Sequence, residues 1–151
     1  MECNDVVFKS ALIVEDCHEQ RNTMSLFMSH QGFAVKTCST RDEALLVLRH
    51  EKFSCLLLDY KMPGMSAEFF IPLIRTRYPL MPIILLTASP DAYELSSKLG
   101  VSGVIPKPFD IDFLFSALER ILEGKKVKHD REVEDFNHMY AKTLERLKSN
   151  I

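Results

Sequence analysis

The sequence predicts an α/β fold built on a doubly wound, five-stranded parallel sheet. Five apolar runs of strand length alternate with segments of helical periodicity. The runs are continuously apolar, which is typical of parallel strands with helices on both faces. Right-handed crossovers then restrict the topology to a doubly wound sheet. The chain has 151 residues, which fits a single domain of this kind with a short appendage.

The first half of the pattern supplies three strands and two helices. The first helix carries Met24, Phe27 and Met28 on one face and ends at Gly32, because glycine suits the residue after a helix. Thr40 and Glu43 have the spacing of a capping box at the start of the second helix. The five expected strands are 11–14, 33–35, 55–58, 83–86 and 103–105.

The third helix is expected to carry Phe70, Leu73 and Ile74, with Ser66 as its N-cap. For the fourth helix, the pattern predicts Ser89 as N-cap, Pro90 at the first helical position and an end at Gly100.

Asp110 is the expected N-cap of the fifth helix, and Pro106 ends the fifth strand. Because proline cannot donate a hydrogen bond to a central ladder, this strand should lie at an edge of the sheet. A flavodoxin-like strand order, 2-1-3-4-5, satisfies that condition.

The C-terminal segment predicts an amphipathic helical extension. It could fold back on its own domain, or it could form a coiled coil through residues 130–151. Such a coiled coil would make a homodimer or lead into an output domain that the sequence lacks. We therefore divide the chain into a domain at 6–123 and a linker with its helix at 124–151. The apolar stripe of this helix consists of Val133, Phe136, Tyr140, Leu144, Leu147 and Ile151.

Composition excludes several classes of protein. The formal net charge is −2, which implies no strong attraction to nucleic acid or to an anionic membrane. The apolar runs are too short to span a bilayer, and residues 1–5 do not resemble a signal peptide, so we expect a cytoplasmic protein. Four single cysteines show no zinc or disulfide pattern.

Reactive polar side chains follow four of the five strands, at the edge where such sheets bind ligands. If the first and third strands are neighbours, three carboxylates share a small volume. Like charges at close range raise each other's pKa unless a cation intervenes, and Mg²⁺ best suits carboxylate and carbonyl oxygens. The side chains are Glu15 and Asp16 after the first strand, Asp59 after the third, Thr87 after the fourth and Lys107 after the fifth.

This set of residues predicts phosphoryl transfer. Asp59 can attack a phosphoryl donor as a carboxylate nucleophile, while Mg²⁺ offsets the charge on the transferring group. Lys107 supplies a positive charge and Thr87 a hydroxyl to the phosphoryl oxygens. The expected Mg²⁺ ligands are Asp16, Asp59, the backbone carbonyl of Lys61 and, through water, Glu15.

Four motifs resemble the CheY-like receiver domain of bacterial two-component response regulators: LIVED (12–16), LDYKMPG (58–64), LTA (86–88) and PKPF (106–109). The resemblance spans about residues 8–122. It implies that Asp59 is the phosphoacceptor, that a histidine kinase or phosphotransfer protein is the donor, and that the Lys107–Pro108 peptide is cis. The family often has an aromatic residue three positions before the lysine, which swings inward when the threonine follows the phosphate; this sequence has Val104 there.

Other functions fit the residues less well. A flavin or nucleotide site on this fold needs a Gly/Ser/Thr-rich loop after the first strand, where the chain has Glu15, Asp16, Cys17 and His18. An aspartyl phosphatase motif, DxDxT, is absent there. A receiver-like module without phosphorylation remains an alternative, although the intact acceptor set counts against it. We expect no direct nucleic-acid binding by this segment.

Overall fold

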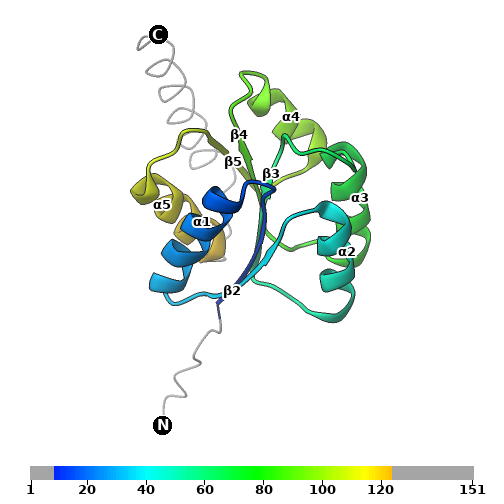
Figure 1. The fold of residues 1–151 in the computed structure, drawn as a ribbon. Coiled ribbons are helices and arrows are strands. Elements are labelled where there is room, and N and C mark those ends of the chain that lie inside the picture. The colour runs from blue at the N-terminus through cyan, green and yellow to red at the C-terminus, as the bar shows by residue number, and fades with distance from the viewer. Residues whose placement is uncertain (1–8, 124–151) are drawn as a thin grey trace.

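The computed structural model describes residues 9–123 and contains one five-stranded parallel sheet (Figure 1). Its order is β2-β1-β3-β4-β5, which confirms the predicted topology and places the proline-ended strand at an edge. The expected helix with its homodimer at 130–151 lies outside the described residues. The strands are β1 (Ser10–Val14), β2 (Ala34–Cys38), β3 (Cys55–Asp59), β4 (Ile83–Thr87) and β5 (Gly103–Pro106).

Five helices cover the two faces of the sheet. In Figure 1, α1 and α5 lie on one face, and α2, α3 and α4 lie on the other. No helix within residues 9–123 is both long enough and apolar enough to cross a membrane. The helices are α1 (His18–His30), α2 (Arg41–His50), α3 (Ala67–Arg77), α4 (Ala92–Leu99) and α5 (Ile111–Leu122).

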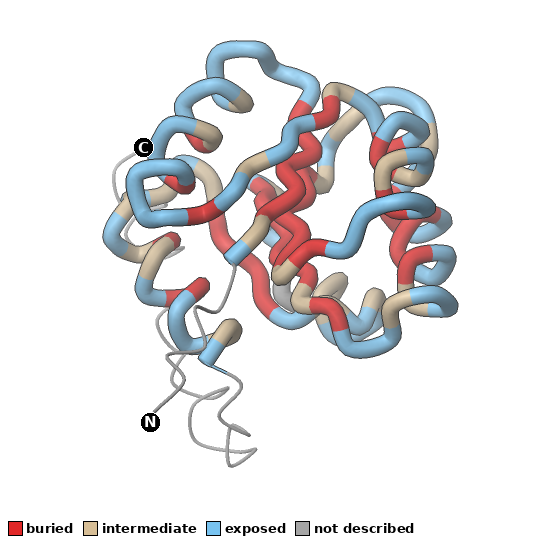
Figure 2. The backbone as a smooth tube through the Cα atoms, turned by 90° about the horizontal axis from the view of Figure 1, so that it is seen from below, coloured by how far each residue is buried: buried red, intermediate tan, exposed pale blue. Residues whose placement is uncertain are grey.

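The central strands β1, β3 and β4 are buried along almost their whole length, as Figure 2 shows in red. Side chains on one face pack with Met24, Met28 and Leu114, from α1 and α5. Side chains on the other face pack with Leu48 and Phe70, from α2 and α3. The buried strands form a rigid base, so the polar residues at their ends have fixed positions.

Most predicted helix caps are present. Thr40 Oγ1 accepts a hydrogen bond from the Glu43 N–H at 3.1 Å, but the Glu43 carboxylate accepts one from Ser39 Oγ at 3.0 Å. The capping box is therefore half formed. Ser66 accepts a bond from the Phe69 N–H at 3.2 Å. The Asp110 side chain caps α5 by accepting a hydrogen bond from the Asp112 N–H in the first turn.

The predicted start of the fourth helix was wrong. α4 begins at Ala92 with Asp91 as its N-cap residue, two positions later than expected. The Ser89 hydroxyl accepts a hydrogen bond from the Asp91 N–H at 3.3 Å, so it closes a short turn before the helix. The end of the helix is as predicted, because Gly100 adopts the left-handed conformation with φ +68°.

Two apolar side chains that the helical pattern groups with buried ones are themselves exposed. Phe27 is 37% exposed and Leu73 is 41% exposed. Both lie at the margin of an apolar stripe whose centre is buried, with Met24 and Met28 in α1 and Ile74 in α3. Apolar residues spaced three and four apart form a stripe that is wider than the contact with the sheet. The sheet therefore buries the side chains at the centre of the stripe and leaves those at its margin exposed.

Candidate functional site

Four polar side chains meet at the carboxyl edge of the sheet because parallel strands place their ends together. Glu15 follows β1, Asp59 and Thr87 are the last residues of β3 and β4, and Lys107 follows β5. The backbone N–H of Lys107 donates to the carbonyl of Thr87 at 2.8 Å, which ties the last two strand ends to each other. These four side chains, which the sequence indicated together with Asp16, therefore lie at one edge.

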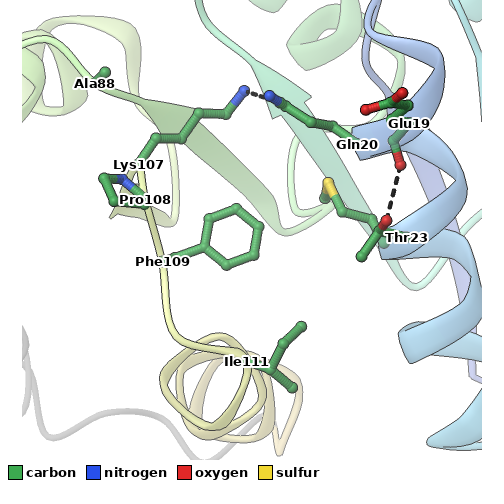
Figure 3. A pocket seen from close by; sticks show the side chains of 9 residues that line it. Glu19, Gln20, Thr23, Ala88, Lys107, Pro108, Phe109 and Ile111 are labelled. Carbon is green, nitrogen blue, oxygen red and sulfur yellow. Dashed lines mark hydrogen bonds between the residues drawn. The ribbon is translucent and has the colours of Figure 1, made fainter.

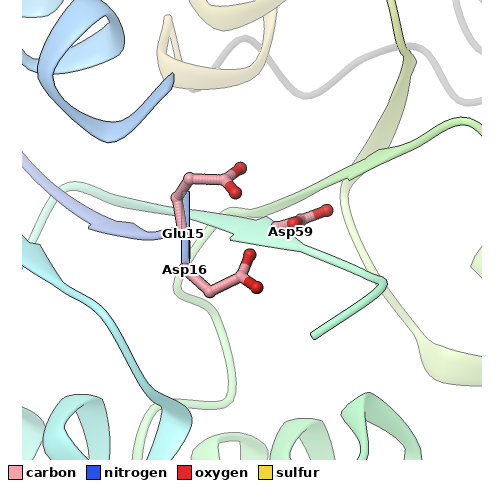
Figure 4. A group of neighbouring side chains, drawn as sticks. All are labelled: Glu15, Asp16 and Asp59. Atoms are coloured by element: carbon pink, nitrogen blue, oxygen red, sulfur yellow. The ribbon is translucent and has the colours of Figure 1, made fainter. Parts of the chain in front are cut away.

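Three carboxylates converge at this edge, as Figure 4 shows. Glu15, Asp16 and Asp59 each offer an oxygen, and these oxygens lie within 4.8 Å of one another. Glu15 and Asp59 are 1% and 5% exposed, whereas Asp16 is exposed. The group thus has a buried side, formed by two acids, and a side that opens to solvent.

The Lys107 ammonium lies between the two buried acids. Its Nζ is 3.0 Å from Glu15 Oε2 and 3.2 Å from Asp59 Oδ1, and it also donates to Gln20 Oε1 at 2.9 Å. Burial lowers the pKa of Lys107, but the hydrogen bond to Glu15 and the charge of Asp59 raise it more, so the net direction is upward. The ammonium is therefore held in its charged form.

Glu15 has a raised pKa despite this ion pair. Burial is the main cause, and the charge of Asp59 adds to it, while the hydrogen bond from Lys107 opposes both. On the buried side of the group, the two carboxylates Glu15 and Asp59 share a single ammonium, so one negative charge is not balanced there. A divalent cation beside Asp16 would balance it.

Thr87 is buried, and its Oγ1 accepts a hydrogen bond from the Ser89 N–H at 3.0 Å. Lys61 is exposed and lies two residues beyond Asp59. Val104 is buried in the core that faces α2 and α3. The Lys107–Pro108 peptide is cis, as the resemblance implied.

This arrangement has a counterpart among known families. Residues 11–119 match the response regulator receiver domain family. The chain belongs to this family. Receiver domains are signalling domains of two-component systems whose activity depends on phosphorylation, and they work with histidine kinases or phosphotransfer proteins.

Two curated relatives illustrate the match. The response regulator protein FleR of Pseudomonas aeruginosa is 33% identical over 116 residues, which cover 76% of this chain and 24% of FleR. The DNA-binding transcriptional regulator NtrC of Salmonella typhimurium is 30% identical over 112 residues, 73% of this chain and 24% of NtrC. The receiver thus spans about a quarter of the length of these relatives.

Solved receivers share its architecture. The chemotaxis protein CheY4 of Vibrio cholerae superposes with a TM-score of 0.71 and 28% identity, covering 76% of this chain and 99% of CheY4. The signal receiver domain of a signal transduction histidine kinase from Syntrophus aciditrophicus gives a TM-score of 0.71 and 25% identity, covering 81% and 96%. Receivers therefore occur both in response regulators and in kinases.

The residues of this receiver fit the Mg²⁺ that receiver domains bind at an acidic pocket. Three carboxylate oxygens close to one another are hard donors of the kind that Mg²⁺ prefers. The exposed Asp16 leaves room for the water molecules that this ion retains. The deficit of positive charge on the buried side favours the same ion.

Sequence reasoning missed three residues around the receiver site. Gln20 accepts the hydrogen bond from Lys107 Nζ. Arg21 Nη1 donates to the Glu15 carbonyl at 2.9 Å, and Arg41 Nη2 donates to the Asp59 carbonyl at 2.8 Å. The only signal for Arg41 was its position, since it falls on the same helix face as the buried Ala44 and Leu48.

The receiver also has a cavity of about 480 Å³ next to Lys107. Figure 3 shows the Phe109 ring and the Lys107 stem on one side and α1 residues, including Gln20 and Thr23, on the other. Lys107 lines the cavity, whereas the three acids Glu15, Asp16 and Asp59 do not. It is lined by Glu19, Gln20, Thr23, Met24, Ala88, Lys107, Pro108, Phe109 and Ile111.

A hydrogen bond from the loop after Asp59 to the first turn of α3 makes the stability of the fold depend on pH. Tyr60 O–H donates to Glu68 Oε1 at 2.6 Å and is the main cause of the lowered pKa of Glu68. The bond therefore stabilises the fold above pH 4.5, the ordinary value, and this contribution is lost as pH falls through the lowered pKa.

Tyr60→Phe should raise the pKa of Glu68 and reduce the stability lost in that acid range. Carboxyl NMR titration measures the first effect and unfolding at several pH values the second. Tyr78→Phe is the matched control, because the Tyr78 hydroxyl donates to the Leu48 carbonyl instead. An unchanged Glu68 titration in Tyr60→Phe would contradict the assignment.

Proposed function

We propose that Asp59 accepts a phosphoryl group and thereby switches this receiver between two signalling states. The single observation that supports this most strongly is the convergence of Glu15, Asp16 and Asp59 at one sheet edge, with the Lys107 ammonium paired to Glu15 and Asp59. When bound, Mg²⁺ supplies positive charge that offsets the developing charge on the phosphoryl oxygens. Its ligands would be Asp16, Asp59, the Lys61 carbonyl and, through water, Glu15.

The residues of the chain divide the chemistry as follows. An Asp59 carboxylate oxygen attacks phosphorus, and the bond from phosphorus to the donor breaks, giving an acyl phosphate. From a phosphohistidine, the electron pair of that bond leaves with the imidazole nitrogen, which then takes a proton. Lys107 binds one phosphoryl oxygen, and the O–H of Thr87 donates to another.

Incubation with acetyl phosphate tests the proposal directly. Intact-mass measurement should show the added mass of one phosphoryl group in the presence of Mg²⁺ and none in EDTA. The fluoride complex of beryllium should bind under the same Mg²⁺ conditions. A chain that binds Mg²⁺ but gains no mass, or that binds no Mg²⁺, would be an interaction module without phosphorylation.

For the donor, we propose a phosphohistidine on a kinase or phosphotransfer protein, which reaches Asp59 past the cavity beside Lys107. The lining of this cavity combines the apolar Phe109 with polar side chains of α1, and such a mixture is suited to binding the surface of another protein. The cytoplasmic location, the output domain and the homodimer remain predictions from the sequence.

Thr23→Arg fills this cavity with a long side chain and tests the docking route. Transfer from a phosphorylated histidine phosphotransfer protein that donates to the wild type should slow strongly. The rate with acetyl phosphate should stay unchanged, because this small donor needs no docking surface. Equal effects on both donors would contradict the route.

A further inference from the structure

Arg41 is a buried cation that the phosphoryl chemistry leaves without a role. It is the first residue of α2, and only 2% of it is exposed. Burial lowers the pKa of its guanidinium, and the charges of Asp59 and Glu68 act against that shift. A buried charge is costly unless its surroundings use it, so its contacts show what it does.

Within residues 9–123, the Arg41 side chain donates its hydrogen bonds to backbone carbonyls of the segment that contains Asp59, the proposed phosphoacceptor. Nη2 donates to the Asp59 carbonyl at 2.8 Å and to the Tyr60 carbonyl at 2.7 Å. Nη1 donates to the Met65 carbonyl. Arg41 Nε is the one buried side-chain polar atom without a partner within residues 9–123. The planar guanidinium therefore holds two separated points of one loop in fixed positions.

These points bracket residues 61–64, which include the Lys61 carbonyl expected to bind Mg²⁺. The loop turns back at Gly64, whose φ is +90°. At its start, the Tyr60 N–H also donates to the Leu86 carbonyl at 2.9 Å. Without Arg41, the Tyr60 and Met65 carbonyls would lose their hydrogen bonds to α2, and the Lys61 carbonyl between them would be held less firmly beside the acids.

We propose that Arg41 is a positioning residue that fixes the Asp59–Met65 loop and thereby sets the Mg²⁺ affinity of the site. This inference rests on the proposed function, because it assumes that the acid group holds Mg²⁺. The Arg41 guanidinium donates to three backbone carbonyl groups, so it would act on the ion through the loop rather than by direct contact. Supporting contacts of this kind typically change metal affinity by about 10- to 100-fold.

Calorimetric titration of the full chain with Mg²⁺ tests the proposal without any measurement of activity. Arg41→Met should weaken Mg²⁺ binding about tenfold. Arg41→Lys should also weaken it, though less, because an ammonium cannot reproduce the fork of the guanidinium. In phosphorylation by acetyl phosphate, the Mg²⁺ concentration at half-maximal rate should rise by the same factor, while the rate at saturating Mg²⁺ is retained.

Arg75→Met is the matched control. Arg75 also donates to backbone carbonyls, those of Gly100 and Met81. These carbonyls lie just before the amino ends of β4 and β5, at the end of the sheet opposite to the acid group. Burial lowers the pKa of Arg75 as well. This variant should lose stability and keep the Mg²⁺ affinity of the wild type, which separates loop positioning from general loosening.

The outcomes distinguish the two proposals. A wild-type chain that binds no Mg²⁺ defeats the proposed function itself. A wild type that binds Mg²⁺ beside a folded Arg41→Met with unchanged affinity overturns the role of Arg41 alone, and so does an equal loss in Arg75→Met. If Arg41→Met does not fold, Arg41→Lys decides: weaker binding supports the inference, and wild-type affinity overturns it.

Discussion

Asp59→Asn is expected to abolish phosphorylation by acetyl phosphate while leaving the chain folded. Asparagine is nearly isosteric, but its amide oxygen is a far weaker nucleophile than a carboxylate oxygen. The substitution also removes a negative charge that raises the pKa of Glu15. In buffer without Mg²⁺, the variant should therefore be at least as stable as the wild type, because the like-charge repulsion is reduced.

Intact mass and thermal unfolding, each with and without Mg²⁺, measure these two effects. Asp112→Asn is the control, since Asp112 is an exposed acid in the first turn of α5, away from the strand ends. It should accept one phosphoryl group at the wild-type rate. If Asp59→Asn still gains that mass, the acceptor is another residue, and the exposed Asp16 is the first to examine.

Lys107→Met should separate metal binding from phosphoryl transfer. Its ammonium lies within 3.2 Å of both Glu15 and Asp59. Removing it leaves two buried carboxylates without their counterion, so the free energy of unfolding should fall by about 3 kcal/mol in metal-free buffer. Phosphorylation should slow about 100-fold because the phosphoryl oxygens lose a fixed cation.

Mg²⁺ should bind this variant more tightly than it binds the wild type, because no ammonium competes for the same carboxylates. Added Mg²⁺ should therefore raise the unfolding temperature of Lys107→Met by more than that of the wild type. Lys36→Met is the control: Lys36 pairs with Glu51 at 2.5 Å on the surface, where such a pair is worth less than about 1 kcal/mol. Equal stability losses in the two variants would show that Lys107 is not a buried counterion.

The strand ends were predictable because parallel strands leave a simple record in the sequence. Burial on both faces requires continuous apolar runs, and the first polar residue after each run marks the edge. Glu15, Asp59, Thr87 and Lys107 were found in this way. Pro106 fixed the edge strand through a missing N–H group.

Contacts made by long polar side chains left no such record. Arg41 looked like a surface charge in the first turn of a helix, and its three acceptors lie 18 to 24 residues later in the chain. Gln20 reaches Lys107 across 87 residues. Every residue has a backbone carbonyl, so an acceptor of this kind cannot be recognised from the residue type. No sequence pattern could therefore have indicated the loop that Arg41 holds.

The proline at the end of β5 also protects the sheet from sideways growth. The N–H of Lys107 donates to the Thr87 carbonyl of β4, and the N–H of Ser102, just before β5, donates to the Ile83 carbonyl. Pro106 has no N–H to offer. The open border of β5 therefore lacks a backbone donor at its last residue, where a foreign strand could otherwise pair. Neighbouring copies gain little by pairing there, and the fold avoids a route to aggregation that an unprotected fifth strand would open.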